Sequence, residues 1–261
     1  MDSSDQELLA ETLRKVMSTS SGPDLDKKLD ELGWQEMLAE HPDVSISLVF
    51  RLLGETGSHS SVVNDVLLRA HNGAPGESVS MPFANGRWVQ WSRDQICSVD
   101  TVDPELPLHE VATGDDIPWG AARVALGWWL IGSSRAMLEL ARTHALDRQQ
   151  FGRPIAAFQA VRHRLAEAYV AIEGAEATLA VADGELGAML AKAAAGKAAS
   201  TTSRHVQQIL GGIGFTAEHA FAGHARRVLM LDALLGSSRE LTGAAGTMIR
   251  NAGHAPRLVD L

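Results

Sequence analysis

Apolar residues recur at helical spacing through the first 70 residues of the chain, with polar residues between them. Leucines three or four positions apart are typical of amphipathic helices whose apolar faces pack together. Gly54 and Gly57 punctuate the later part of this region. The expected helices cover residues 5–17, 25–40, 46–53 and 62–70. We therefore predict a helical N-terminal domain over residues 1–70.

The pattern changes between residues 71 and 118, where Gly, Pro, Asn and Asp become frequent. Residues 86–91, G-R-W-V-Q-W, alternate in the way that a β-strand does. With strands of ~5–6 residues and their turns, the segment has room for about three or four strands. We expect a small sheet or ribbon, because the segment is too short for a full sandwich domain.

Helical periodicity returns at Trp119. The expected helices are residues 119–147, a segment that begins near Phe158, residues 186–210 and residues 225–250. The second of them has apolar residues at alternating steps of four and three positions, namely Val161, Leu165, Ala168, Ile172, Ala175, Leu179 and Ala182. Such a seam favours near-antiparallel packing, so residues 119–261 are expected to form a four-helix bundle. Gly236 and Gly243 are the candidate breaks in the last helix.

Composition indicates an ordinary globular protein, with 45% hydrophobic and 21% charged residues in a chain of 261. No apolar run reaches the roughly 18 residues that a membrane span needs, so no membrane association is expected. The start, MDSSDQE, is acidic where a secretory signal would be basic and then apolar. The single cysteine, Cys97, excludes an intrachain disulfide and suits a reducing compartment. The sequence thus predicts a cytoplasmic protein.

Charge is unevenly distributed along the chain. The net charge is −9, the sum of −13 over residues 1–120 and +4 over residues 121–261. Seven arginines but only two acidic residues lie between positions 123 and 164. Local positive charge in an acidic protein suits a phosphate-bearing small ligand better than nucleic acid, which needs a broader basic face. The alternative is that several of these arginines are solvated helix residues.

One run of sequence joins the first two helices of the predicted bundle: R-Q-Q-F-G-R-P-I at residues 148–155, followed by F-Q at 158–159. Its glycine and proline end the first helix and turn the chain. An arginine at such a helix end can form a forked pair with phosphate oxygens, which makes Arg148 a candidate binding residue. The alternative is a plain helix–turn–helix corner in which Arg148 interacts with the helix C-terminus.

A second run, Q-I-L-G-G-I-G-F at residues 208–215, follows the third helix of the bundle. A dinucleotide-binding Rossmann motif is excluded, because a helix and not a strand precedes the glycines. Adjacent glycines allow backbone N–H groups to approach a diphosphate, and Gln208 offers an amide to an adenine or ribose edge. The alternative is a helix C-cap at Gly211 and Gly212.

Other candidates for chemistry are weaker. The histidines of the bundle lack the spacing of metal ligands, and Cys97 has no partner, so no metal site is expected. Trp128 and Trp129 are interpreted as core or interface residues and not as a cofactor stack. Serine, histidine and aspartate occur without the context of a nucleophile elbow.

Together, the two runs resemble the flavin-contacting motifs of the acyl-CoA dehydrogenase family. The resemblance covers about residues 123–250 and extends more faintly to L-D-E-L-G-W at residues 29–34. In that family, the two motifs hold the FAD of a neighbouring subunit. By this resemblance, the residues that contact the ADP half of the flavin are Arg148, Phe151, Gln159, Gln208, Gly211 and Gly212.

The same resemblance implies a fold and a reaction. The fold is mainly α, with a helical N-terminal domain, a middle β-domain and a C-terminal four-helix bundle. The reaction is the α,β-dehydrogenation of an acyl-CoA, in which a glutamate takes the α-proton and the β-hydrogen leaves as hydride to the flavin. An electron-transfer flavoprotein is the expected partner for the electrons.

Three departures from the family pattern affect this expectation. Leu235 occupies the position of the usual glutamate, and the alternative position on the first bundle helix is Ala122, before Arg123. Neither side chain can accept a proton. The middle β-domain is reduced to residues 71–118. Glu240, the nearest carboxylate in sequence, lies five positions after Leu235 and is rotated by about 140° on a helix.

The sequence therefore predicts a non-catalytic subunit of a heteromeric acyl-CoA dehydrogenase, with no catalytic residue of its own. A full-length homologue would supply the β-domain, the catalytic glutamate and the acyl-CoA pocket, and this chain would share its FAD. A bulky, steroid-derived thioester is the substrate class suggested by analogy. Two alternatives stay open: a self-contained enzyme in which Glu240 or another carboxylate is the base, and a flavin-free scaffold.

Overall fold

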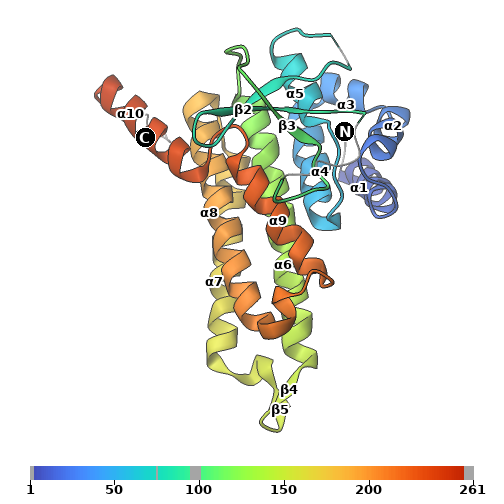
Figure 1. Ribbon diagram of the computed structural model, residues 1–261, viewed down its shortest axis with the longest axis vertical. Helices are drawn as coiled ribbons and strands as arrows, with labels where there is room; N and C mark the ends of the chain where they lie inside the picture. Colours follow the sequence, from blue (N-terminus) through green and yellow to red (C-terminus); the bar gives the residue numbers. More distant parts are fainter. Residues whose placement is uncertain (1–2, 75, 95–100, 256–261) are drawn as a thin grey trace.

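The computed structural model describes residues 3–74, 76–94 and 101–255 of the chain. A bundle of long helices runs along the longest axis of the molecule. The N-terminal helices and a small sheet pack around one end of this bundle (Figure 1). Within the described residues, no helix is both long enough and apolar enough to cross a membrane. Cys97, on which the expectation of a reducing compartment depends, lies outside these residues.

Five helices make up the N-terminal part: α1 (Ser3–Met17), α2 (Pro23–Glu31), α3 (Trp34–Glu40), α4 (Pro42–Thr56) and α5 (Val63–Ala70). The prediction of a single helix over residues 25–40 is wrong. Gly33 adopts a left-handed conformation (φ 84°) that ends the helical path, and glycine does this without steric cost. The turn places the fully buried Trp34 so that its Nε1–H donates to Asp65 at 3.0 Å.

Three antiparallel strands follow: β1 (Ser80–Phe83), β2 (Arg87–Trp91) and β3 (Leu108–Val111), in the order β1-β2-β3. The strand expected near residues 86–91 is confirmed, and its alternation buries Val89 and Trp91. Residues 84–86 connect β1 to β2, and Asn85 and Gly86 both have positive φ (65° and 71°), a conformation that asparagine and glycine tolerate in tight turns. The reduced β segment is therefore a three-stranded sheet within the described residues.

The bundle consists of α6 (Gly120–Asp147), α7 (Gln159–Ala180), α8 (Gly184–Leu210) and α9 (Ala220–Ala233). The predicted four-helix bundle and mainly-α fold are confirmed (Figure 1). The apolar seam of α7 faces its neighbours, and its central residues are buried, namely Ala168, Ile172, Ala175 and Leu179.

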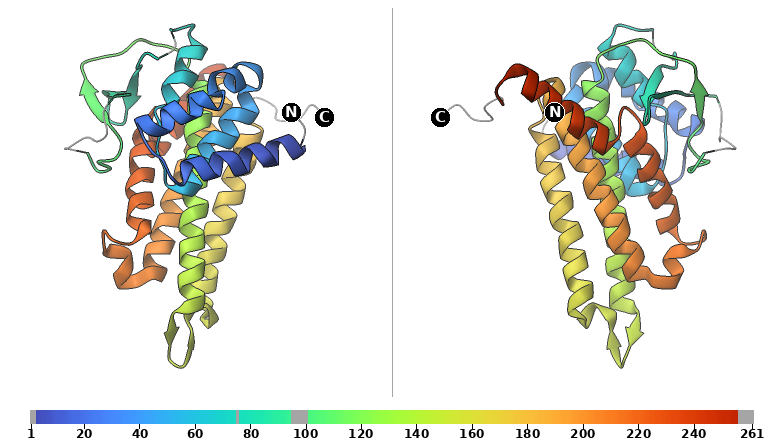
Figure 2. Two further views of the ribbon diagram at one scale, coloured as in Figure 1. Left: turned by 90° about the vertical axis from the view of Figure 1, so that its right-hand side faces the viewer. Right: turned by 60° about the vertical axis from the view of Figure 1, so that its left-hand side comes forward.

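The last helix expected, residues 225–250, is two helices. The chain leaves α9 at Leu234 and begins α10 (Ser238–Ala252) after Gly236, which has φ 95°. The break predicted at Gly236 is confirmed, whereas Gly243 lies inside α10 and interrupts nothing. Figure 2 shows α10 extending away from the other bundle helices.

The N-terminal helices dock on the bundle where α4 crosses α6. A Cβ atom at Gly54 would overlap the α6 backbone at Trp129, and one at Gly132 would overlap the α4 backbone at Arg51. Glycine at both positions therefore allows the two helix backbones to touch. Buried residues from α1 to Leu235 form one continuous apolar cluster.

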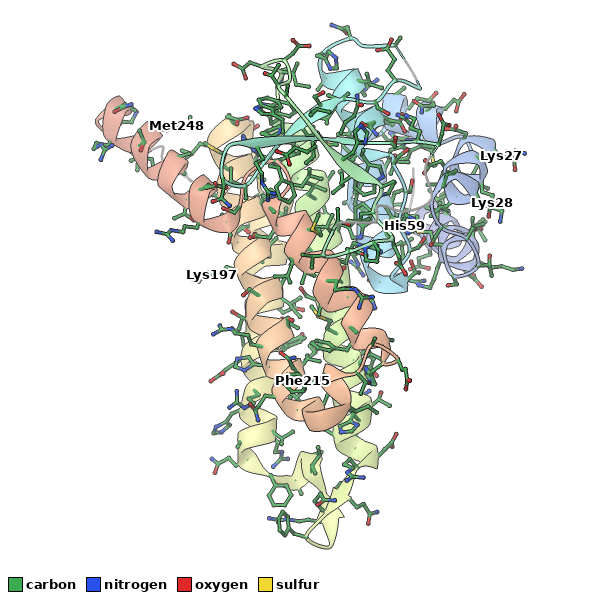
Figure 3. The ribbon with its side chains drawn as sticks, in the orientation of Figure 1. Lys27, Lys28, His59, Lys197, Phe215 and Met248 are labelled. Carbon is green, nitrogen blue, oxygen red and sulfur yellow. The ribbon has the colours of Figure 1, made fainter. Side chains whose placement is uncertain are left out.

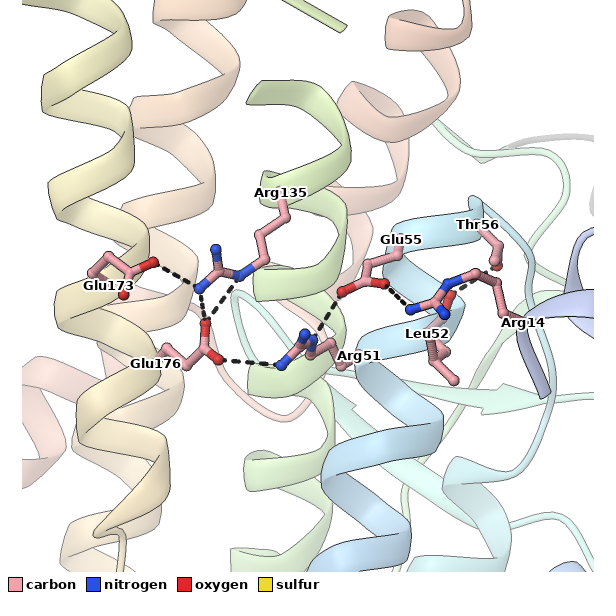
Figure 4. Close-up of polar contacts among 8 residues, drawn as sticks. All are labelled: Arg14, Arg51, Leu52, Glu55, Thr56, Arg135, Glu173 and Glu176. Atoms are coloured by element: carbon pink, nitrogen blue, oxygen red, sulfur yellow. Dashed lines mark hydrogen bonds and ion pairs between the residues drawn. The ribbon is translucent and has the colours of Figure 1, made fainter. Parts of the chain in front are cut away.

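Ion pairs lie beside this crossing (Figure 4). Glu176 of α7 accepts from Arg135 of α6 and from Arg51 of α4, the latter at 3.4 Å. Arg51 also pairs with Glu55 at 2.8 Å, and Arg14 of α1 reaches Glu55 at 3.2 Å. The network links α1, α4, α6 and α7, and because it is partly exposed, its contribution to stability is modest.

A buried arginine links α9 to the segment before β3. Arg227 and Asp103 are both almost fully buried and form a direct ion pair. The same guanidinium pairs with Glu105 at 2.7 Å and donates to the carbonyl oxygen of Ser58 at 3.0 Å. Removing either member of such a buried pair leaves an uncompensated charge, so the link ties the segment of Asp103 and Glu105 to α9.

Candidate functional site

The first motif forms a hairpin at the far end of the bundle, opposite the sheet (Figure 1). Strands β4 (Gln149–Gln150) and β5 (Arg153–Pro154) pair across a two-residue turn at Phe151 and Gly152. Both turn residues have positive φ, 54° and 76°, as the favoured hairpin turn demands. Phe151 is 91% exposed, so the structure holds a large apolar ring in solvent at a strained backbone position.

Arg148 follows α6 directly and is exposed. Its backbone carbonyl oxygen accepts from the N–H of Ile155 at 2.8 Å, which closes the base of the hairpin. Its guanidinium makes no hydrogen bond or ion pair with any residue in the described part of the chain, the carbonyls at the end of α6 included. Arg148 is the C-cap residue of α6, and its binding to a ligand stays a prediction.

Aromatic rings order the segment between the hairpin and α7. Phe151 and Phe158 meet edge to face with 6.0 Å between ring centroids, and Arg153 lies over the Phe158 ring at 4.4 Å. Gln159, the first residue of α7, is exposed and lies 3.4 Å from His163, measured between their Nε2 atoms.

The second motif ends α8 beside the hairpin. Gly211 is the C-cap of α8 and has φ 61° and ψ −135°, a backbone conformation that glycine adopts more readily than other residues. The predicted helix cap is therefore confirmed. The short helix η2 (Gly211–Phe215) continues from it. A Cβ at Gly211 or Gly212 would meet nothing within 4 Å, so the backbone here is open to a ligand as well. Phe215, labelled in Figure 3, is 77% exposed.

A cavity of about 410 Å³ brings parts of the two motifs together. Phe151 of the first motif and Gln208 of the second line it, whereas Arg148, Gln159, Gly211 and Gly212 lie outside its lining. The wall also includes Arg164, which the sequence interpretation did not single out. Arg164 lies four positions after Ala160, another lining residue, and residues four apart share one face of a helix. This spacing is the sequence feature that could have indicated Arg164.

At the other end of the bundle, the segment that carries Leu235 is buried and hydrogen-bonded to neighbouring elements. Leu235 is fully buried and has φ 59°, a left-handed conformation that is unusual for a bulky residue. Its N–H donates to Pro82 at 2.8 Å, and its carbonyl oxygen accepts from Nε of Arg123 at 3.2 Å. The N–H of Ala84 donates to Ala233 at 2.9 Å, so the end of β1 pairs with this segment.

Lys192 supports the same segment from α8. It is fully buried, and its Nζ donates to the carbonyl oxygens of Asp232 at 2.9 Å and Gly236 at 2.7 Å. Burial lowers the pKa of Lys192 to about 7. No sequence pattern had marked this lysine, because only the folded chain brings α8 against the end of α9.

Ala122 and Arg123, the other candidate position for a base, are also enclosed. Ala122 is 1% exposed. Arg123 pairs with Glu185 of α8 in addition to its bond with Leu235, and burial lowers the pKa of its guanidinium. Both positions therefore carry groups that hold the fold together.

Glu240 is committed to a helix cap. Its carboxylate accepts from the N–H of Ser237 at 2.9 Å, from the Ser237 hydroxyl at 2.7 Å and from the N–H of Asn85 at 2.9 Å. The Ser237 hydroxyl first, and then the two backbone donors, hold the pKa of Glu240 below its usual value. A carboxylate saturated in this way is a poor general base.

The histidines form no metal site among the residues that the structure describes. Burial, assisted by the nearby Arg227, lowers the pKa values of His59 and His224 to about 4, so both are neutral at physiological pH. His144 and His219 line an open groove of about 670 Å³ between α6 and α9, which has no link to either motif. Trp129 is fully buried and stacks on Trp91 at 5.8 Å, as expected of a core residue.

Comparison with known proteins gives an independent view of the chain. Residues 119–244 match the family model described as acyl-CoA dehydrogenase, C-terminal domain. The acyl-CoA dehydrogenase IpdE2 of Mycobacterium tuberculosis (strain ATCC 25618 / H37Rv) is 34% identical over 167 residues, which are 60% of this chain and 52% of that protein. The chain thus spans about half the length of this curated relative.

Two solved structures share the fold over nearly the whole chain. A variant of the Tcur3481-Tcur3483 steroid ACAD superposes with a TM-score of 0.75 at 17% identity, covering 96% of this chain and 99% of that chain. The ChsE4-ChsE5 complex from Mycobacterium tuberculosis gives a TM-score of 0.64 at 15% identity, covering 98% of this chain and 99% of that chain. At this identity, the likeness establishes the arrangement of the elements and nothing finer.

Proposed function

This chain belongs to the acyl-CoA dehydrogenase family, and from that premise we propose that it is a non-catalytic subunit of a heteromeric, FAD-dependent acyl-CoA dehydrogenase. The observation that carries the proposal is the contrast between the two ends of the bundle. The segment at Leu235 is buried and hydrogen-bonded on both sides, while Arg148 and the glycines at 211 and 212 are open.

The residues at the hairpin end fit the nucleotide half of a flavin. The guanidinium of Arg148 has no partner among the residues that the structure describes and can bind a phosphate, and Gly211 and Gly212 offer an unobstructed backbone. Phe151, Gln159 and Gln208 complete the proposed set with a ring and two amides. A cavity of about 410 Å³ lies within the range of ligand pockets and suits part of a dinucleotide.

The Leu235 segment does not fit the reactive end of a flavin or an acyl thioester. Leu235 presents no exposed surface, and its side chain cannot accept a proton. The bound flavin supplies the hydride acceptor for α,β-dehydrogenation, and we assign the ring system, the base and the acyl-CoA pocket to a full-length partner. This chain's part is to orient the nucleotide end of that shared cofactor.

The partner, the substrate and the electron acceptor are proposed by analogy. Two of the similar structures are named as pairs, Tcur3481-Tcur3483 and ChsE4-ChsE5, and the first is named a steroid ACAD. We accordingly propose an assembly of two copies of each subunit acting on a bulky, steroid-derived CoA thioester. An electron-transfer flavoprotein is the acceptor proposed from the family resemblance.

Two alternatives remain testable. A self-contained enzyme that uses Glu240 is disfavoured, because three donors already occupy that carboxylate. A flavin-free scaffold would keep the bundle for assembly alone, and it would give the two motifs at the hairpin end no ligand.

Purification of the chain alone and with a co-expressed full-length homologue separates these functions. The proposal expects a colourless chain alone, and a complex that is yellow and oxidises an acyl-CoA with an artificial electron acceptor. A yellow, active chain alone would establish the self-contained enzyme. A complex that forms and stays colourless in excess FAD would establish the scaffold.

A further inference from the structure

Arg164 is the only charged residue in the described wall of the 410 Å³ cavity. It lies on α7, on the face that carries Ala160 and Val161 into the same wall, and it is partly buried. The remaining wall is formed by aromatic, aliphatic and amide side chains. A single guanidinium among such groups is well placed to select an anionic ligand, because the surroundings exclude part of the competing water.

A histidine holds this guanidinium from the neighbouring helix. Nη1 of Arg164 lies 3.2 Å from Nδ1 of His205, and Nε2 of His205 lies 3.1 Å from a carboxylate oxygen of Glu167. Because arginine can only donate and a carboxylate can only accept, both contacts are satisfied by one tautomer. Nδ1 of a neutral His205 accepts from Arg164, and its Nε2–H donates to Glu167.

The geometry points to Arg164 as a phosphate-binding residue of the shared nucleotide site, positioned by the His205–Glu167 pair. This inference rests on the proposed function and extends it beyond the two sequence motifs. The other N–H groups of Arg164 have no partner among the residues that the structure describes, so they can donate to phosphate oxygens. A charge-assisted bond of this kind complements the one proposed for Arg148.

The arrangement makes the position of Arg164 dependent on the protonation of His205. A protonated imidazole carries N–H at both nitrogens, so it would repel the guanidinium that it holds when neutral. Partial burial, followed by the charges of Arg164 and Arg204, lowers the pKa of His205, and Glu167 opposes them. Glu167 and Arg164 lie on α7 and Arg204 on α8, and the lowered pKa that results favours neutral His205 at physiological pH.

The test uses the complex with its full-length partner after removal of the flavin, and measures the dissociation constant of FAD by fluorescence quenching. Arg164→Gln is expected to weaken FAD binding by about tenfold or more. Arg162→Gln, at an exposed arginine two positions earlier on α7, is the matched control and should stay within about twofold. ADP should compete with FAD in the unaltered complex and lose most of that ability with Arg164→Gln, whereas competition by adenosine should be unchanged.

The role of His205 has a separate readout. FAD affinity of the unaltered complex should fall as the pH is lowered from ~8 to ~5.5, across the range in which histidine titrates. His205→Gln, whose amide can accept from Arg164 and donate to Glu167, should keep the affinity and remove this pH dependence. His205→Leu should resemble Arg164→Gln at every pH. A purely structural histidine would instead give equal losses with both replacements.

Equal FAD affinities for Arg164→Gln and Arg162→Gln would overturn the inference, as would equal losses of ADP and adenosine competition. Its failure is distinguishable from failure of the proposed function through Arg148→Ala. If Arg148→Ala weakens FAD binding and Arg164→Gln does not, only the role of Arg164 is wrong. If the unaltered complex binds no FAD, the proposed function itself fails.

Discussion

Arg123 donates from its Nε to the carbonyl oxygen of Leu235 at 3.2 Å, and this bond joins the start of α6 to the turn between α9 and α10. By the family resemblance, Leu235 occupies the position of the usual catalytic glutamate, and Arg123 directly follows the alternative position at Ala122. Here they hold each other in the protein interior, with Pro82 bonded to the other side of Leu235. The turn that carries Leu235 therefore stabilises the packing of α6, β1 and α9 against one another.

Leu235→Glu is expected to create no second active site. A carboxylate in this fully buried position is desolvated, which raises its pKa and favours the neutral acid. The turnover of the complex per bound flavin should stay unchanged, and the chain alone should remain inactive. The melting temperature should fall, since a polar group replaces a packed leucine. A gain of activity in the chain alone would contradict the non-catalytic assignment.

Under the proposed function, Glu240→Gln should leave the kcat of the complex nearly intact, because this carboxylate caps α10 and a base in the partner takes the α-proton. Glutamine has a single amide oxygen, so it can accept from only one of the backbone N–H groups of Ser237 and Asn85, whereas Glu240→Ala loses both. The alanine variant should therefore lose about 1 kcal/mol of unfolding free energy, typical of a lost cap. A fall of several orders of magnitude in kcat with Glu240→Gln would identify a catalytic base in this chain.

Lys192 should make the unfolding free energy rise with pH. Its folded pKa, about 7, lies below the ordinary value near 10.5, so between these values the unfolded chain binds the extra proton. Stability therefore increases as the pH rises through this window, by at most about 1.4 kcal/mol per pH unit. Urea unfolding at pH ~7 to ~9.5 should show this slope, and Lys192→Met should remove it.

Lys197→Met is the matched control for that experiment, since Lys197 is an exposed lysine of the same helix, α8. It should leave the pH slope unchanged. Lys192→Met should also lower stability overall, because the carbonyls of Asp232 and Gly236 lose their buried donor. Equal pH slopes in both variants would show that another group titrates.

Arg148→Ala should lower the flavin occupancy of the complex at limiting FAD. A charge-assisted phosphate contact is typically worth ~1.5–3 kcal/mol, which corresponds to a fall in affinity of about tenfold or more. Arg239→Ala, at an exposed arginine of α10, serves as the control and should keep full occupancy. The ratio of flavin to protein absorbance gives the occupancy directly. An unchanged ratio with Arg148→Ala would refute the assignment of this residue.

The chain alone should self-associate, and with its partner it should form an even-numbered assembly. Trp129 and Leu130 are fully buried in the fold, so they cannot contribute to an intersubunit surface. Phe151 and Phe215, one in each motif and 91% and 77% exposed, are the better candidates. Phe215→Ser should weaken association with the partner in light scattering and leave the melting temperature of the chain alone unchanged. A chain that is monomeric both with and without the partner would contradict this prediction.

The sequence by itself determined the helices of the bundle, the strand at residues 86–91 and the break at Gly236. These depend on residues near one another in the chain: the apolar seam of α7 repeats within one helix, and a glycine with positive φ ends a helix wherever it lies. The two motifs could be identified for the same reason, because each is one continuous run.

Only the tertiary structure decided which distant residues meet. Arg164 and His205 are 41 positions apart, Lys192 and Gly236 are 44 apart, and Arg227 and Asp103 are 124 apart. No local pattern marks such pairs, since the charged side chain of each pair alone looks like a solvated charge on a helix or loop. Burial makes these pairs necessary. Once packing removes water from a charged group, that group needs a hydrogen-bonding or charged partner, and the fold determines which residue becomes the partner.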